Sequence, residues 1–508
     1  MSPISNFILR REILKRFFLA LMVLATGTLT TIVILIPNIR LDSQTVYDML
    51  TALYVILGLF FIYRFSYSLR SYGSLDPFEL PVWLTLTLFF FVILMGRPVF
   101  NDPSLLSHRL KGNYEFLNIA LAGVLLGVVS LWLGYAINLS SLLSRFWLRI
   151  SSGQRQFEET PRFFAILSIY GIGVLVRLVM IATRSYAYLS EKGGVETWGG
   201  FNQWLYYLSY GAPLMALAVL GMQVFKDRMP PYGRVIFYLM LLTEVFFTSI
   251  GGVKGPILTL IFVVVGSSLY SGKSIPWRPV ILLALLFVLL IPVNLLYRAS
   301  IGRGNVNSSS IGGASQKMMQ LFTETWLSGS FAENLQSGAT LVRERQGSLI
   351  QNIALAMYYT PEIKPYLDGK SFRLLPLTLV VPRIIWPEKP QDEMGRWFSI
   401  EYAGAPANSR GSCALTPFGD LYLNFGWPGI ALGMFVLGIV YRFSYELVRT
   451  AGRESYLAIY LGLLFVATNY ESSFTGLIHV GFWHLIALYF FSRLLYKRHS
   501  LAPESCGV

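Results

Sequence analysis

The sequence predicts an all-α polytopic membrane protein of about twelve transmembrane helices, with a large helical extracytoplasmic loop between the ninth and the tenth. Of the 508 residues, 54% are hydrophobic and 13% are charged, whereas soluble domains carry about 25% charged residues. The mean hydropathy is +0.55. Apolar runs long enough, or nearly long enough, to cross a bilayer recur along the chain, and lipid leaves helices as the only reasonable form for them.

The predicted spans divide the chain into three parts. Residues 1–296 hold helices one to nine, residues 297–424 form the extracytoplasmic loop, and residues 425–508 hold helices ten to twelve and a cytoplasmic tail. The spans are placed at Phe17–Ile36, Val46–Tyr63, Pro81–Met95, Phe116–Ile137, Phe163–Ile181, Trp204–Val224, Val235–Ile250, Gly255–Tyr270, Pro279–Leu296, Trp427–Leu447, Tyr456–Thr468 and Leu477–Leu495. Because the first apolar run is long and lacks a small-residue cleavage site, it is interpreted as a retained helix and not as a signal peptide.

Basic residues set the predicted orientation. With the N-terminus inside, the inner segments hold roughly three times as many Lys and Arg residues as the short outer loops, which is the bias of cytoplasmic loops. We therefore expect both termini in the cytoplasm and residues 297–424 outside. The net charge of +14 then marks cytoplasmic loops and does not indicate a nucleic-acid partner.

The long outer interval is expected to form a small helical cap. A flexible stretch, Gly302–Ser315, precedes three segments with apolar residues at helical spacing, Gln316–Leu327, Phe331–Arg345 and Leu349–Tyr359. A disordered loop is the alternative, and the aromatic residues and the periodicity argue against it.

A proline-rich strip at Val381–Pro390 follows these helices, and the rest of the interpretation is built around it. Its three prolines fix φ and stiffen the chain without a hydrogen-bonded ladder, so Arg383 and Lys389 are held at a defined spacing. Trp386 adds a flat apolar face of the kind that lies along a membrane surface or a sugar ring. The strip predicts a site for an anionic, lipid-linked ligand, and a turn that only packs the loop remains the alternative.

Further charged residues join the candidate site. Arg177 and Glu244 are ionisable residues inside predicted spans and are functional candidates by default, although Arg177 as a snorkelling anchor or as the structural partner of Glu244 stays open. Lys254 lies in a glycine-rich outer turn where a point charge can meet a phosphate, if the turn is more than a connector. The remaining candidates on the same predicted face are Arg298, Glu401, Arg410, Asp420, Tyr422, Glu471 and His479.

This mixture of cations and carboxylates is typical of transfer chemistry at a phosphorylated leaving group, with a carboxylate or a histidine as base. A lone histidine such as His479 is more often an interface residue that only donates or accepts a hydrogen bond. The chain has no phosphate-binding G-x-x-x-x-G-K-[ST] loop and no H-E-x-x-H helix, and its two cysteines, Cys413 and Cys506, form no framework. No metal and no cofactor are predicted.

Two motifs resemble those of the bacterial O-antigen polymerases, the oligosaccharide repeat-unit polymerases of the Wzy type. They are Pro382-Arg383-x-x-Trp386-Pro387-x-Lys389-Pro390 and Gly419-Asp420-Leu421-Tyr422-x-Asn424-Phe425-Gly426-x-x-Gly429. The predicted topology is similar to that family along the whole chain. The turn around Lys254 is similar to the family's Gly-x-Arg-Gly element, with lysine in place of arginine, which puts in doubt any role that needs a bidentate guanidinium.

The resemblance implies a metal-independent glycosyltransferase in the bacterial inner membrane. Such an enzyme moves a growing glycan from polyprenyl diphosphate to a new lipid-linked repeat unit at the outer face, with membrane lipids, a chain-length regulator and a flippase as expected partners. The diphosphate would be held by Arg383, Lys389, Arg298 and Lys254, and a sugar or phosphate by Arg410. The base would be one of Glu401, Asp420, Glu471 and His479, and Trp386 and other outer aromatic residues would stack on sugars.

Three other functions remain open at this point. A flippase or transporter would suit about twelve helices, but the chain shows no repeated halves with broken helices at matching positions. A ligase of similar architecture would use the same donor and a different acceptor. A binding or assembly protein of an envelope complex is the third.

Overall fold

The computed structural model describes residues 42–72, 75–137, 157–183, 185–186, 201–252, 255–302, 311–327, 331–381, 385–386, 389, 394–407, 412–451, 453–467 and 469–500. Within them, nine helices are long and apolar enough to cross a membrane. Two shorter apolar helices, Ile257–Tyr270 and Glu454–Leu464, correspond to the predicted eighth and eleventh spans. The predicted first span, Phe17–Ile36, lies outside the described residues. The protein is therefore an all-α polytopic membrane protein.

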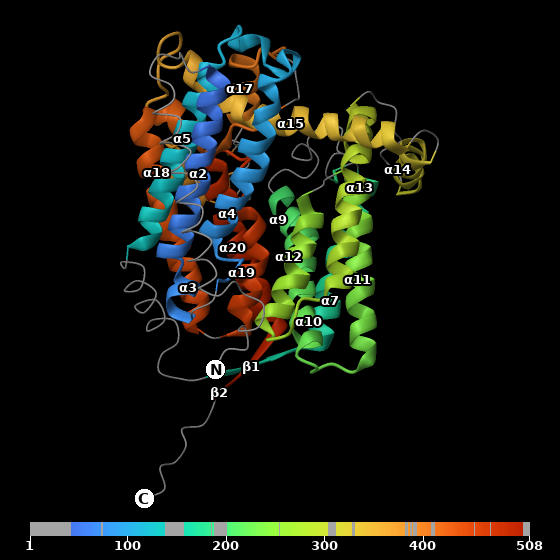
Figure 1. Ribbon diagram of the computed structural model, residues 1–508. Helices are drawn as coiled ribbons and strands as arrows, with labels where there is room; N and C mark the ends of the chain where they lie inside the picture. Colours follow the sequence, from blue (N-terminus) through green and yellow to red (C-terminus); the bar gives the residue numbers. More distant parts are fainter. Residues whose placement is uncertain are drawn as a thin grey trace, which may run out of the picture.

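The first group of helices stands on the left of Figure 1. It is built from α2 (Ser43–Phe65), α3 (Tyr67–Tyr72), α4 (Leu80–Leu88) with the π-helical η2 (Phe89–Leu94), the short turns η3 (Arg97–Phe100), η4 (Pro103–Leu105) and η5 (His108–Leu110), and α5 (Glu115–Ala136). The long helix α18 (Thr416–Ala451) packs closely along α5. Gly134 and Gly438 let the two backbones approach, because a Cβ at either glycine would lie 2.0 Å from a carbonyl oxygen of the other helix.

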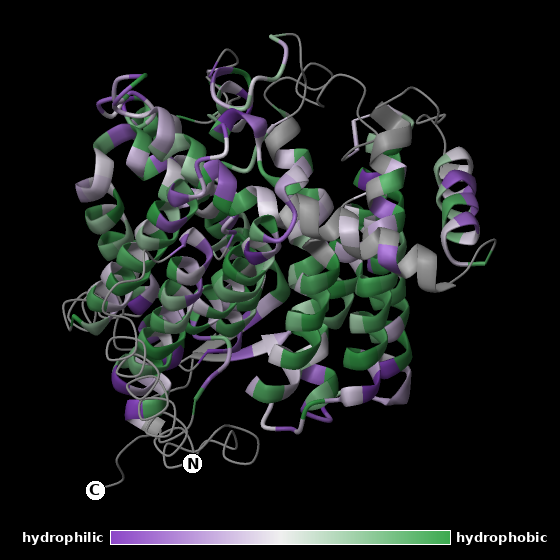
Figure 2. Cartoon of the chain, turned by 45° about the horizontal axis from the view of Figure 1, so that its top comes forward, coloured by the Kyte–Doolittle hydropathy of each residue, from purple (hydrophilic) through white to green (hydrophobic). Residues whose placement is uncertain are grey.

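The second group stands on the right. It is built from α7 (Phe163–Ala182), α9 (Asn202–Tyr206), the π-helical η8 (Tyr207–Gly211), α10 (Ala212–Phe225), α11 (Pro231–Ile250), α12 (Gly255–Tyr270) and α13 (Trp277–Gly302). Each group encloses its own apolar core, and α19 (Glu454–Ala467) and α20 (Phe474–Leu495) stand between the groups in Figure 1. Figure 2 shows hydrophobic residues along the middle of the helices and hydrophilic residues towards their ends.

One end of the bundle, here called the α15 end, carries the remaining helices. They are α14 (Ile311–Trp326), α15 (Phe331–Tyr359), α16 (Leu375–Val380) and α17 (Met394–Glu401). Helix α15 is continuous, although the sequence predicted two helices there, Phe331–Arg345 and Leu349–Tyr359. It crosses the top of Figure 1 from the first group towards α13. Its second half packs on α5 and α18 and supplies buried Ile350 and Ile353 to the first core.

The opposite end carries a small antiparallel sheet and is here called the β1–β2 end. Strand β1 (Phe157–Pro161) pairs with β2 (Tyr496–Ser500), which directly follows α20. The Glu454 carboxylate binds Lys226 and Arg228 at 2.5 and 2.9 Å. These contacts fasten the start of α19 to the connection between α10 and α11.

Candidate functional site

The second motif, residues 419–429, lies within the first part of helix α18. Helix α18 begins at Thr416, about ten residues before the predicted span. It is interrupted at Gly426, whose φ of 64° and ψ of −150° are reserved for glycine, and Pro428 follows without an N–H group. The segment 416–425 is therefore a short half-helix that carries Asp420, Tyr422 and Asn424.

Asp420 links this half-helix to the start of α20. Its side chain is fully buried, and one carboxylate oxygen accepts hydrogen bonds from the backbone N–H and the hydroxyl of Thr475, both at 3.1 Å. The other oxygen accepts from the amide of Asn424 at 2.9 Å and from the hydroxyl of Ser371 at 3.3 Å. Among the described residues, four donors therefore bind this carboxylate, and these contacts suit a positioning role.

The first motif reaches the same helix through Lys389. Its residue is 2% exposed, and its ammonium group donates to the carbonyl of Val381 at 3.1 Å and lies 5.5 Å from the centre of the Trp483 ring. Val381 is the C-cap of α16, so the lysine places a positive charge at a helix C-terminus. Lys389 therefore fastens α16 to α20, while half-buried Trp386 accepts the backbone hydrogen bond of Lys389 at 3.0 Å.

Aromatic rings join the three segments. Phe372, just before α16, lies 5.3 Å from Phe425 of α18 and 5.9 Å from Phe474 of α20, measured between ring centres. The half-helix 416–425, the segment around α16 and the first turns of α20 therefore meet in one place, although they come from three separate stretches of the chain.

A second contact region lies beside it, around Thr360. The Tyr422 hydroxyl donates to the carbonyl of Thr360 at 3.2 Å, and the hydroxyls of Thr360 and Tyr402 are 2.9 Å apart. Burial raises the pKa of Tyr402 above its ordinary value. Glu401 is exposed and forms an ion pair of 2.7 Å with Lys364.

Two of the other predicted site residues lie close to Thr475 in the chain. Glu471, in the turn before α20, and His479, in its second turn, are both half-buried and lie on the same short stretch of chain as Thr475. Lys254, Arg383 and Arg410 lie outside the described residues. Arg298 belongs to α13, and only its backbone is described.

Arg177 lies in a buried ion pair with Glu244, and its role in substrate binding stays a prediction. It is 1% exposed, and its guanidinium forms a bidentate pair with Glu244 at 2.7 and 2.8 Å. Its Nε atom also donates to the carbonyl of Ser209 in η8 at 2.5 Å, and the rings of Tyr210 and Phe247 flank it. The guanidinium thereby ties α7, η8 and α11 together, and pairing with Glu244 is the structural alternative that the sequence left open.

Sequence reasoning missed a buried polar cluster near the β1–β2 end. The Glu79 carboxylate accepts hydrogen bonds from the hydroxyls of Ser66, Ser68 and Tyr135 at 2.5 to 2.7 Å. Asp76 accepts from the hydroxyl of Tyr445 at 2.7 Å. The signal in the sequence was the pair of acidic residues in Asp76-Pro77-Phe78-Glu79, placed directly before an apolar span.

Arginine completes that cluster. Arg442 pairs with Glu446 at 2.7 Å and lies over the rings of Tyr67 and Tyr135, at 4.2 and 5.3 Å from their centres. The cluster joins α3, α5 and α18, and its carboxylates are satisfied by neighbouring donors, which is the pattern of a structural network. Among the described residues, no group of three or more His, Cys, Asp and Glu side chains could hold a metal ion.

Comparison with known proteins assigns the chain to a family but does not indicate an activity. Residues 174–503 match a family model described as a domain of unknown function, DUF8712. This range contains the half-helix 416–425, α16 and α20. No curated protein and no solved structure matches the chain.

Proposed function

The chain belongs to the family described as a domain of unknown function (DUF8712), and from its own residues we propose that it is an oligosaccharide repeat-unit polymerase of the bacterial inner membrane. The acceptor hydroxyl of a new lipid-linked repeat unit attacks the anomeric carbon of the growing glycan. The bond from that carbon to the diphosphate oxygen breaks, polyprenyl diphosphate leaves, and a base on the protein takes the hydroxyl proton.

One observation carries the proposal: the two motifs that resemble the polymerases both contact the first half of α20. Asp420 of the second motif binds Thr475, and Lys389 of the first motif lies over Trp483. Residues that act on one substrate have to lie close together, and a shared helix brings the two motifs near each other.

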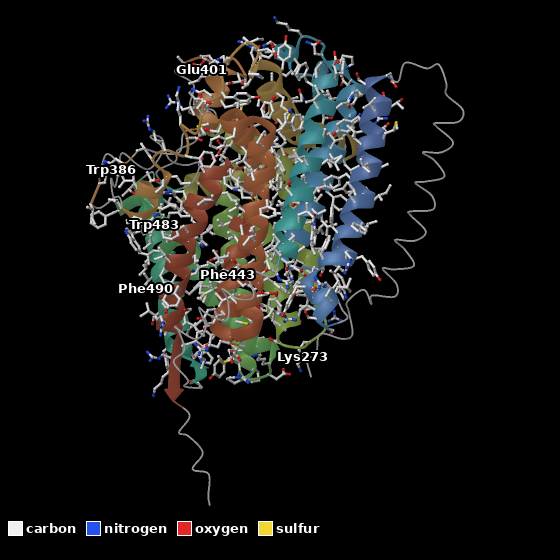
Figure 3. All side chains as sticks on the ribbon, turned by 90° about the vertical axis from the view of Figure 1, so that its left-hand side faces the viewer. Lys273, Trp386, Glu401, Phe443, Trp483 and Phe490 are labelled. Carbon is white, nitrogen blue, oxygen red and sulfur yellow. The ribbon has the colours of Figure 1, made fainter. Side chains whose placement is uncertain are left out.

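The charge distribution supports an outward-facing site. The connections at the β1–β2 end are rich in Lys and Arg and include Arg70, Lys226, Arg228, Lys273 and Arg453. Lys273 lies at the opposite end of the molecule from Glu401 in Figure 3. Since short cytoplasmic loops carry the excess of basic residues, the β1–β2 end is assigned to the cytoplasm and the α15 end to the outer face.

The roles of individual residues follow from their surroundings. Lys389 and Asp420 are committed to α16 and α20, so they position the site. The diphosphate is assigned to Arg383, with Arg298, Lys254 and Arg410 as further cations, because positive side chains stabilise the charge that develops on a leaving diphosphate. Glu471 and His479, which flank Thr475 in the chain, are the candidates for the base, with exposed Glu401 as a third.

Purified protein in detergent, supplied with lipid-linked repeat units, tests this proposal. A ladder of lengthened, lipid-linked glycans is the expected product. Transport of the unlengthened substrate across vesicles, without a ladder, would indicate a flippase. Transfer of the glycan only to a different acceptor would indicate a ligase, and either result would overturn the polymerase assignment.

A further inference from the structure

The short segment around α16 has the composition of a membrane-embedded element. Eight consecutive residues, Leu374 to Val381, include no charged side chain, and Thr378 is their only side chain with a polar group. The Thr378 hydroxyl is turned inward and donates to the carbonyl of Leu375 at 3.0 Å. Residues 374–381 and 385–386 are here called the apolar flap.

The outer face of the flap is apolar and uncovered. Leu374, Leu377, Val380 and Ile385 are 44%, 49%, 74% and 74% exposed. The first three recur every three residues and lie along one side of α16. A protein surface in water seldom presents so many large aliphatic side chains together, whereas a surface in lipid does so routinely.

Backbone groups at the ends of α16 are bonded within the protein, as hydrocarbon requires. Thr378 and Val381 donate their N–H groups to the carbonyls of Leu374 and Leu377 at 2.8 and 3.0 Å. The carbonyl of Val381, at the open end of the helix, accepts from the ammonium of Lys389 at 3.1 Å. A short helix in lipid needs this kind of cap because no water is present to bind its last carbonyls.

The flap also continues a surface that already faces lipid. Helix α16 packs on α20, a candidate span whose exposed side chains include Leu485 and Phe490, at 44% and 56%. In Figure 3, Trp386 lies beside the bundle, below the level of Glu401 and a little above that of Trp483. The flap therefore occupies the depth of the outer part of α20 and not the tip of the α15 end.

We propose that the apolar flap is inserted into the hydrocarbon of one leaflet, at the α15 end, and that lipid acyl chains cover its exposed face. The inference does not depend on the proposed reaction, because it concerns only the environment of the surface. It moves a segment that the sequence assigned to the extracytoplasmic loop into the membrane, with Lys389 between it and α20.

Spin-label accessibility tests this placement. Single-cysteine variants Val380→Cys and Ile385→Cys are made in full-length protein whose Cys413 and Cys506 are replaced by alanine, labelled with a nitroxide and reconstituted into liposomes. Phe490→Cys serves as the lipid-facing reference. Ile363→Cys serves as the matched control, because Ile363 is an aliphatic residue of 58% exposure between Glu362 and Lys364. Leu377→Cys replaces either flap variant that fails to fold.

The expected result is collision with oxygen in preference to a water-soluble nickel complex at positions 380 and 385. The ratio of oxygen accessibility to nickel accessibility at these positions should match the ratio at position 490 and exceed the ratio at position 363 severalfold. Nickel accessibility at the level of position 363 would place the flap in water and overturn the inference. Protection from both reagents, with spin–spin broadening that disappears on dilution with unlabelled protein, would assign the face to a second copy and overturn it equally.

Discussion

The carboxylate of Asp420 accepts both the backbone N–H and the hydroxyl of Thr475, so one buried acid holds the broken start of α18 against the first turn of α20. A carboxylate at a helix N-terminus is also stabilised by the helix dipole. This contact links the half-helix 416–425 to α20, and substitutions can remove its two hydrogen bonds separately.

Replacing Thr475 by valine removes the hydroxyl donor and keeps the backbone donor. Hydrogen bonds to charged groups contribute about 1.5–3 kcal/mol, so Thr475→Val should lower the midpoint of thermal unfolding in detergent and reduce chain lengthening. Thr475→Ser, which keeps the hydroxyl, is the matched control and should behave like the wild type. Equal loss in both variants would show that the methyl group, and not the hydrogen bond, is what matters.

Substitutions of Arg177 and Glu244, which form a buried ion pair, should have non-additive effects on folding. Arg177→Met leaves an unpaired carboxylate in a low-dielectric environment, which costs about 3–5 kcal/mol, and should sharply reduce the yield of folded protein. The double variant Arg177→Met/Glu244→Leu should recover most of that loss. A single variant that folds normally but makes no glycan ladder would support the predicted role of Arg177 in substrate binding.

Gly426 should not tolerate a side chain. A Cβ there would adopt a disfavoured conformation and lie 3.0 Å from the Tyr366 hydroxyl, and such strain costs about 1–3 kcal/mol. Gly426→Ala is therefore expected to lower the unfolding midpoint. Gly171→Ala in α7 is the control, because no atom beyond its own stretch of helix lies within 4 Å of the added Cβ. Similar midpoints for the two variants would contradict the helix break at Gly426.

Asp227 should make the thermal stability of the protein depend on pH in the acidic range. Its hydrogen bonds with Lys273 and then Arg234 lower the pKa of the carboxyl below its ordinary value of 3.8. Because the folded-state pKa is depressed, the pair stabilises the fold above pH 3.8 and loses this effect as pH falls through the folded-state pKa. Thermal melts of Asp227→Asn should therefore differ from wild type at neutral pH and converge with it in strong acid. A constant difference across that range would contradict the ion-pair explanation.

Most of the spans could be predicted because each is a local property of the sequence. The nine long helices coincide with predicted apolar runs, since lipid selects hydrophobic length directly. The predicted span begins at Trp427 and α18 begins at Thr416, because Gly426 is a helix-breaking residue and the sequence predicts no helix before it. The sequence predicts two helices where α15 is continuous, because the polar residues in the middle of α15 show no apolar periodicity.

The contacts of the site could not be predicted because they join residues that are distant in the chain. Asp420 binds Thr475, which lies 55 positions later in the chain, and Asp76 binds Tyr445, which lies 369 positions later. Composition identifies such acids as costly inside a membrane but does not name their donors. The contacts of Lys389 could not be predicted for the same reason, since neither the Val381 carbonyl nor the Trp483 ring is marked by a local pattern.

The glycan ladder made by Arg383→Ala tests the central claim, that a cation of the first motif holds the leaving diphosphate. The variant should insert into the membrane normally and lose chain lengthening by at least about 100-fold. The control Arg493→Ala removes an exposed arginine at the other end of α20 and should leave the ladder intact. A normal ladder from Arg383→Ala would contradict the account.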